Sequence, residues 1–67
     1  STELTERQNL ILKMIQSGDT NQIIAARMGY SESLIRQETI MIYRKLGVSG
    51  RRDLVIEPRD TRKQGPD

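Results

Sequence analysis

Apolar residues recur at intervals of three and four along most of the chain, which is the spacing of amphipathic helices. The first such stretch contains Leu10, Ile11, Leu12, Met14 and Ile15. Thr5 and Gln8 precede it in the pattern of a capping box, in which each side chain bonds the backbone amide of the other residue. Gly18 then supplies a left-handed stop. The pattern predicts a helix over residues 6–17.

Two further helices are predicted from their capping residues. Thr20 is a candidate N-cap for a helix over residues 21–28 that Gly29 ends. Ser31 is a candidate N-cap for a longer helix over residues 32–46 that Gly47 ends. The core residues expected from these two helices and the turn between them are Ile24, Ala25, Met28, Tyr30, Ile35, Thr39, Ile42 and Leu46.

The last part of the chain divides at Pro58. Leu54, Val55 and Ile56 precede it, which favours a short fourth helix within residues 50–57. Residues 58–67 have no large apolar side chain, so we expect a flexible C-terminal tail. The predicted fold is all-α, a small four-helix bundle-like domain over residues 4–57.

The second and third predicted helices meet the requirements of a helix-turn-helix. Such a unit needs a small residue where the helices cross, a glycine in the turn and an apolar residue that holds the second helix against the first. Ala25, Gly29 and Ile35 provide these in that order. The sequence therefore predicts a helix-turn-helix with a three-residue turn.

The amino-acid composition excludes several kinds of metal site and catalytic site. The chain has 67 residues, enough for one small domain, and it lacks cysteine, histidine and tryptophan. Disulfides, zinc sites and catalytic groups that need Cys or His are excluded. Its carboxylates are scattered and it has no glycine-rich phosphate loop, so we expect no enzyme activity, metal or cofactor. It has no apolar run of membrane-spanning length and no signal peptide, so we expect a cytoplasmic domain.

The positive charge is unevenly distributed. Eleven Lys and Arg against nine Asp and Glu give a net charge of +2. Residues 1–19 sum to −1, residues 20–50 to +2 and residues 51–67 to +1. The excess over the predicted helix-turn-helix is a mild indication of a polyanionic partner.

Several short motifs run through the predicted helices: Leu4-Thr5-Glu6-Arg7, Gly18 with Asn21, Ile24-Ala25 and Arg27, Ser31-Glu32-Ser33, and Lys45-Leu46-Gly47-Val48 followed by Arg51. As a set, over about residues 4–55, they resemble the LuxR/GerE type of bacterial DNA-binding domain, a four-helix module usually found at the C-terminus of transcription regulators. The resemblance implies that the 32–46 helix enters the DNA major groove. It also implies that the fourth helix takes part in dimer formation, with Leu54 and Val55 as the expected interface.

One face of the 32–46 helix is the candidate surface for contact with DNA. In a helix-turn-helix, Arg36 and Gln37 on this face can reach base edges or phosphate, and Ile40 can touch a thymine methyl group or a sugar. A solvated helical face is the alternative interpretation. The full set of expected DNA-binding residues is Thr20, Asn21, Ser33, Arg36, Gln37, Ile40, Arg44, Lys45 and Arg51.

Two features of this helix keep a second function open. Glu38 stands where the family usually has histidine, and it either accepts a hydrogen bond from a cytosine amino group or pairs within the protein. Ile40 and Met41 suit a protein surface as well as DNA. The alternative function is a degenerate helix-turn-helix used for protein–protein interaction or dimerisation. Double-stranded DNA is the expected partner, with a second copy of the chain and RNA polymerase as further candidates.

Overall fold

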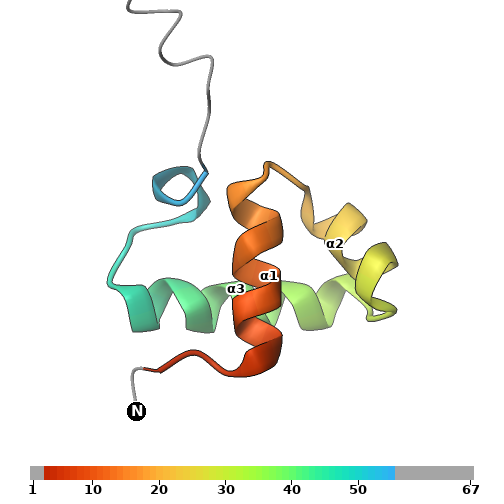
Figure 1. Cartoon of the computed structure of the whole chain (residues 1–67), viewed down its shortest axis with the longest axis horizontal. Coiled ribbons are helices and arrows are strands. Elements are labelled where there is room, and N and C mark those ends of the chain that lie inside the picture. The colour runs from red at the N-terminus through yellow and green to blue at the C-terminus, as the bar shows by residue number, and fades with distance from the viewer. Residues whose placement is uncertain (1–2, 56–67) are drawn as a thin grey trace, which may run out of the picture.

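The computed structural model describes residues 3–55, which form three α-helices and one short 3-10 helix. The elements in order are α1 (Glu6–Gln16), α2 (Asn21–Met28), α3 (Glu32–Leu46) and η1 (Arg51–Asp53), as Figure 1 shows. The described residues contain no strand. The all-α class is therefore confirmed, and the three predicted helix ranges agree with the observed ones to within one residue.

A hydroxyl side chain at the N-cap position begins each α-helix. In α1, the Thr5 hydroxyl accepts from the Gln8 amide at 3.1 Å, and the Gln8 side-chain oxygen accepts from the Thr5 amide at 3.0 Å. Thr20 accepts from the Ile23 amide at 3.2 Å at the start of α2. Ser31 caps α3 in the same way. Each hydroxyl satisfies a backbone donor that the first turn of a helix leaves free.

The turn between α2 and α3 depends on the backbone freedom of Gly29. This residue has φ of 76° in the left-handed region, and its amide donates to the Ala25 carbonyl at 2.9 Å. A Cβ atom at Gly29 would meet nothing within 4 Å. Glycine is thus required here for its φ angle and not for space.

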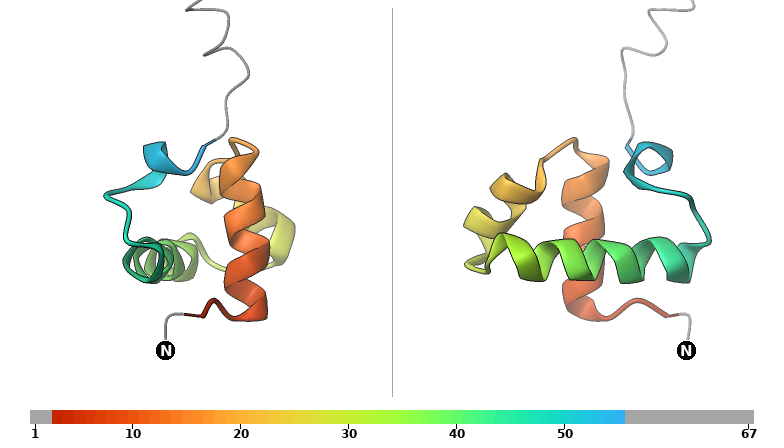
Figure 2. Two further views of the ribbon diagram at one scale, coloured as in Figure 1. Left: turned by 60° about the vertical axis from the view of Figure 1, so that its left-hand side comes forward. Right: turned by 180° about the vertical axis from the view of Figure 1, so that it is seen from behind.

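α1 and α2 lie on the same side of α3. Figure 1 shows α1 crossing in front of α3, and the view from behind in Figure 2 shows α3 passing in front of α1, with α2 beside the start of α3. This arrangement buries the face of α3 that carries Ile35, Thr39 and Ile42 and leaves the opposite face exposed.

The core is small and made almost entirely of isoleucine. Six residues with at most 6% exposure form it: Ile11, Ile15, Ile24, Ala25, Ile35 and Ile42. The last four were expected core residues, and Ile11 and Ile15 belong to the apolar stretch that predicted the first helix. Isoleucine is stiff in a helix and has only moderate helix propensity. The helices therefore depend on burial against one another more than on their intrinsic propensity.

Two expected core residues are exposed instead. Leu46 is 39% exposed because it is the last residue of α3, directly before Gly47, where the chain leaves the helix axis. Tyr30 is 38% exposed, since it lies in the turn. The Arg7 guanidinium lies over its ring, 4.9 Å from the ring centroid.

The predicted fourth helix is not confirmed. Within the described residues 50–55, the only helical element is the 3-10 helix η1, and Val55 after it is not helical. Gly50 offers no side-chain cap, and Arg51 and Arg52 place positive charge at the helix start, where it opposes the helix dipole. Residues 56 and 57 of the predicted helix and the predicted flexible tail, 58–67, lie outside the described residues.

Gly29→Ala should lower the free energy of unfolding by about 1–2 kcal/mol, because an L-residue in the left-handed region costs roughly that much. Gly50→Ala is the matched control, since Gly50 has extended backbone with φ of −179° and open space around its Cβ position. Urea unfolding of the two variants measures the difference. Equal losses would show that the φ angle of Gly29 is not what the turn requires.

Candidate nucleic-acid interface

Five residues of α3 form a continuous exposed surface, which we call the outer face: Ser33, Arg36, Gln37, Ile40 and Arg44. They lie opposite the buried Ile35 and Ile42. Among the described residues, the side chains of Arg36, Gln37 and Arg44 have no hydrogen-bond or ion-pair partner. The structure thus brings together five of the nine predicted DNA-binding residues on one open, positively charged face.

Glu38 points away from the outer face. One of its carboxylate oxygens accepts from the Arg7 guanidinium at 3.0 Å, and the other accepts from the Gln8 amide nitrogen at 3.0 Å. Its side chain is 14% exposed. Of the two interpretations that the sequence left open, the structure supports pairing within the protein, because both carboxylate oxygens already have donors.

Arg7 links the start of α1 to the helix-turn-helix. Its guanidinium bonds Glu38 in α3 and stacks on Tyr30 in the turn. The hydrogen bond to Glu38 is the main reason why the pKa of Arg7 is raised above its ordinary value. The cation–π contact with Tyr30 adds a second attachment to the turn.

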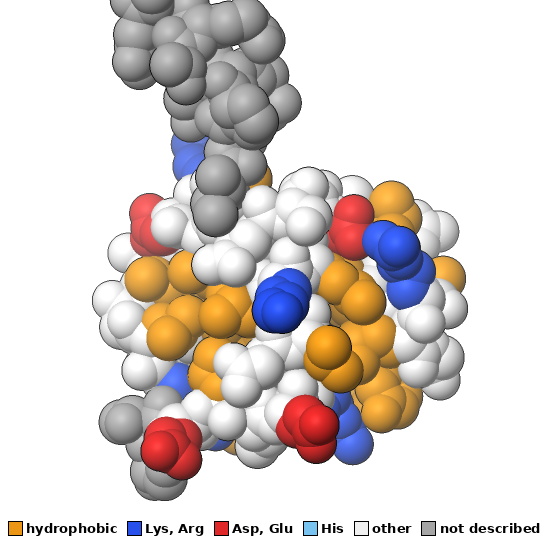
Figure 3. Space-filling view, viewed as in Figure 1, with side chains coloured by type: hydrophobic (Ala, Val, Ile, Leu, Met, Phe, Trp, Pro, Cys, Tyr) orange, Lys and Arg blue, Asp and Glu red, His pale blue; other side chains and the backbone are white. Residues whose placement is uncertain are grey.

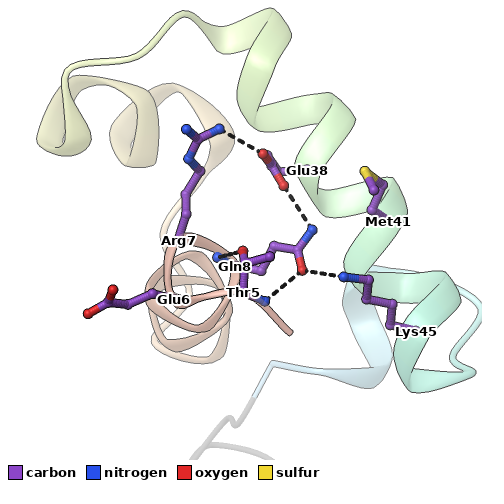
Figure 4. A pocket seen from close by; sticks show the side chains of 7 residues that line it. All are labelled: Thr5, Glu6, Arg7, Gln8, Glu38, Met41 and Lys45. Atoms are coloured by element: carbon purple, nitrogen blue, oxygen red, sulfur yellow. Dashed lines mark hydrogen bonds and ion pairs between the residues drawn. The ribbon is translucent and has the colours of Figure 1, made fainter. Parts of the chain in front are cut away.

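Gln8 is the centre of this polar cluster, which we define as Arg7, Gln8, Glu38 and Lys45. The Gln8 residue is 2% exposed. Its amide nitrogen donates to Glu38, while its oxygen accepts from the Thr5 amide and from the Lys45 ammonium at 2.9 Å. Figure 4 shows these side chains pointing toward one another between α1 and α3. A buried amide with all these partners joins the two helices at a defined register.

Lys45 therefore faces α1 and not the outer face. Its ammonium also donates to the Glu3 carbonyl at 3.1 Å, so two of its three N–H groups have protein partners. Arg44, the adjacent residue, is exposed on the outer face. The predicted role of Lys45 in DNA binding stays a prediction.

Three other predicted residues meet at the start of α2. The Arg51 guanidinium of η1 donates to the Asn21 side-chain oxygen at 3.1 Å, which joins residues thirty positions apart. Thr20 precedes Asn21 as the N-cap and is exposed. A second nitrogen of Arg51, Nη2, is buried without a hydrogen-bond partner among the described residues. Both terminal nitrogens of Arg51 are therefore engaged or buried in this arrangement, and the predicted DNA-binding roles of these three residues stay predictions.

Leu54 and Val55, the predicted dimer residues, are half-buried and pack against the isoleucine core. They contribute to the stability of the monomer whether or not a second copy binds. Their role in a dimer stays a prediction.

A hollow of about 470 Å³ lies beside the polar cluster. The residues that line it are Thr5, Glu6, Arg7, Gln8, Glu38, Met41 and Lys45. Most of its polar atoms already bond one another, so they are not arranged to take a ligand. In the described range no three metal-ligating side chains come together.

The structural role of Gln8 and Arg7 in joining α1 to α3 was missed from the sequence. Gln8 was identified as a capping residue only, although it shares the three- and four-residue spacing of Ile11 and Ile15 and so belongs to the buried face of α1. That spacing is a signal that could have revealed its burial. No local signal pairs Arg7 with Tyr30 or Glu38, because these residues are distant in sequence.

Comparison with known protein families shows the family of the chain. Residues 2–57 match the family described as bacterial regulatory proteins, luxR family, and the chain belongs to that family of helix-turn-helix DNA-binding transcriptional regulators. The family is one of regulators and not a class of enzymes.

Among curated proteins, the chain is 37% identical over 54 residues to the transcriptional regulatory protein YdfI of Bacillus subtilis (strain 168). The matched segment covers 81% of this chain and 25% of YdfI, so it corresponds to about a quarter of that relative. No solved structure is significantly similar to the chain. No helix in the described part of the chain is long and apolar enough to cross a membrane.

Gln8→Ala should lower the free energy of unfolding by about 1–3 kcal/mol, because it removes half of the capping box and leaves partly buried donors and acceptors without a partner. Gln22→Ala is the matched control, since Gln22 is exposed on α2. Thermal and urea unfolding measure both variants. Similar stability in the two variants would contradict a structural role for the polar cluster.

Glu38→Gln should lower the melting temperature and leave affinity for duplex DNA unchanged. Arg7 and Gln8 both donate to residue 38, and an amide offers one acceptor oxygen where the carboxylate offers two. Glu32→Gln, at an exposed position of α3, removes the same charge and is the control. Tighter DNA binding by Glu38→Gln at an unchanged melting temperature would instead place Glu38 at the DNA.

Proposed function

We propose that this domain binds double-stranded DNA with sequence preference and that α3 lies in the major groove. The observation that carries the proposal is the outer face, where Arg36, Gln37 and Arg44 are exposed and have no partner within the described residues. The major groove is about 12 Å wide and an α-helix with its side chains is about 10–12 Å across, so the helix fits.

The side chains of the outer face are suited to the major groove of DNA. Arg36 and Arg44 are the charged members, and their forked guanidinium groups match phosphate or a guanine edge. Gln37 can make a bidentate pair with adenine, and Ser33 can bond either a base or a phosphate. Glu38 is held inward by Arg7 and Gln8, so its negative charge does not oppose phosphate at this face.

A second set of contacts is proposed at the start of α2. Thr20 is exposed there, and Asn21 and Arg51 are already joined by a hydrogen bond. We place these three residues against the DNA backbone, where they would set the angle of α3 in the groove. Lys45 retains one free N–H and adds positive potential, while its main bonds hold α1.

The interaction-module alternative has one observation in its favour. Ile40 and Met41 are adjacent and each 45% exposed, so they offer apolar area to a protein partner. Homodimer formation through Leu54 and Val55, contact with RNA polymerase and a cytoplasmic location are further parts of the proposal. A dimer would place two α3 helices on two half-sites of the DNA.

Binding to generic duplex DNA should weaken steeply as salt is raised. Each phosphate contact should add about 0.9 to the slope of log affinity on log salt. Arg36→Gln should lower affinity and, where Arg36 contacts phosphate, reduce the slope by about 0.9. Fluorescence anisotropy over a salt series measures both quantities.

Lys13→Gln is the charge-matched control for this series. Lys13 is exposed on α1 and lies midway in sequence between the buried Ile11 and Ile15. Its side chain is therefore on the helix face away from the core and from α3. Figure 3 shows basic side chains on the α1 side of the molecule, which is the side opposite the outer face. Equal losses in Arg36→Gln and Lys13→Gln would indicate attraction by net charge alone. No binding at low salt by the folded domain would overturn the proposed function.

A further inference from the structure

One apolar residue stands at the centre of the outer face. Ile40 is 45% exposed, and the other four members of the face are polar or charged. At 3.6 residues per turn, all four lie within about 60° of Ile40 around the helix axis. A large aliphatic side chain therefore occupies the position that the proposed DNA complex would bring closest to the floor of the groove.

We propose that Ile40 reads the 5-methyl group of thymine, so that DNA preferred by this domain carries a thymine beneath the middle of α3. The inference rests on the proposed function. The thymine methyl group is the apolar group that base edges present in the major groove, so it is the chemistry that Ile40 can recognise there. Ile40 is also β-branched and held in a narrow rotamer range by the helix, so it loses little freedom on contact.

The neighbours of Ile40 support this arrangement. Arg36 and Arg44 lie four residues before and after it, which is a rise of about 6 Å in each direction along the axis. They can hold phosphates or flanking bases while the uncharged side chain remains over the base edges. Gln37 lies one turn before Ile40 on the same face, about 4.5 Å away along the helix axis. An adenine that Gln37 pairs with would therefore lie close to the proposed thymine.

Met41 provides an internal comparison. It has the same 45% exposure as Ile40, but it lies about 100° around the helix. It lines the hollow beside α1 with Glu38 and Lys45, as Figure 4 shows. Met41 is thus an equally exposed apolar residue that should not contact a base.

The experiment uses the 67-residue chain and a pool of duplex DNA with a randomised centre. The best-bound duplex is resynthesised with each thymine replaced in turn by deoxyuridine, which lacks only the 5-methyl group. At one position we expect the affinity of the wild-type chain to fall about fourfold, the effect of one buried methyl group. Met41→Ala should show the same fall, and Ile40→Ala should bind dT and dU duplexes equally.

The outcomes separate this inference from the proposed function. Selective binding with no sensitivity to deoxyuridine would overturn the role of Ile40 and leave DNA binding in place. A methyl effect that persists in Ile40→Ala would assign it to another residue. No selected duplex at all would overturn the proposed function together with the inference. A melting curve for Ile40→Ala establishes that the variant is folded, as expected for an exposed position on a helix.

Discussion

Burial of one face of α3 is the constraint on which the other features depend. Ile35 and Ile42 lie two turns apart on this face and are fully buried. Ile11 and Ile15 of α1 and Ile24 of α2 belong to the same core cluster. A core of so few side chains cannot cover both sides of a helix, so the opposite side of α3 stays open. The surface available to a partner is therefore a direct result of the small core.

The polar cluster defines the position of α1 on α3 more closely than the apolar core does. Isoleucine contacts are non-directional, so they hold α1 near α3 without determining its rotation in detail. Gln8 adds directional bonds to Glu38 in α3 and to Lys45, which lies about two turns further along the same helix. Since Gln8 is buried, shifting α1 along α3 would leave several polar groups without partners, which is costly. The cluster thereby specifies one register for the two helices.

The same cluster separates the charges of α3. Glu38 and Lys45 are turned toward α1, whereas Arg36 and Arg44 are turned outward. A helix that carries both signs of charge in its sequence thus presents a positive outer face. This sorting follows from helical geometry together with the donors and acceptors that α1 supplies at its N-terminal end.

Local signals in the sequence determined much of this fold. The caps at Thr5, Thr20 and Ser31 and the left-handed glycines at 29 and 47 act over a few residues, so the bounds of the three helices and the turn could be predicted from them. The isoleucine core followed from helical spacing in the same way.

Only the tertiary structure decided the rest, because it concerns pairs of residues far apart in the chain. Glu38 had two interpretations until Arg7 and Gln8, about thirty residues earlier, were placed beside it. The exposure of Leu46 and Tyr30 depended on where the helices end relative to the core, and helical spacing carries no information about that. The expected fourth helix is not confirmed within residues 50–55: Leu54 and Val55 are packed against the core there by the short 3-10 helix η1 and the residues after it.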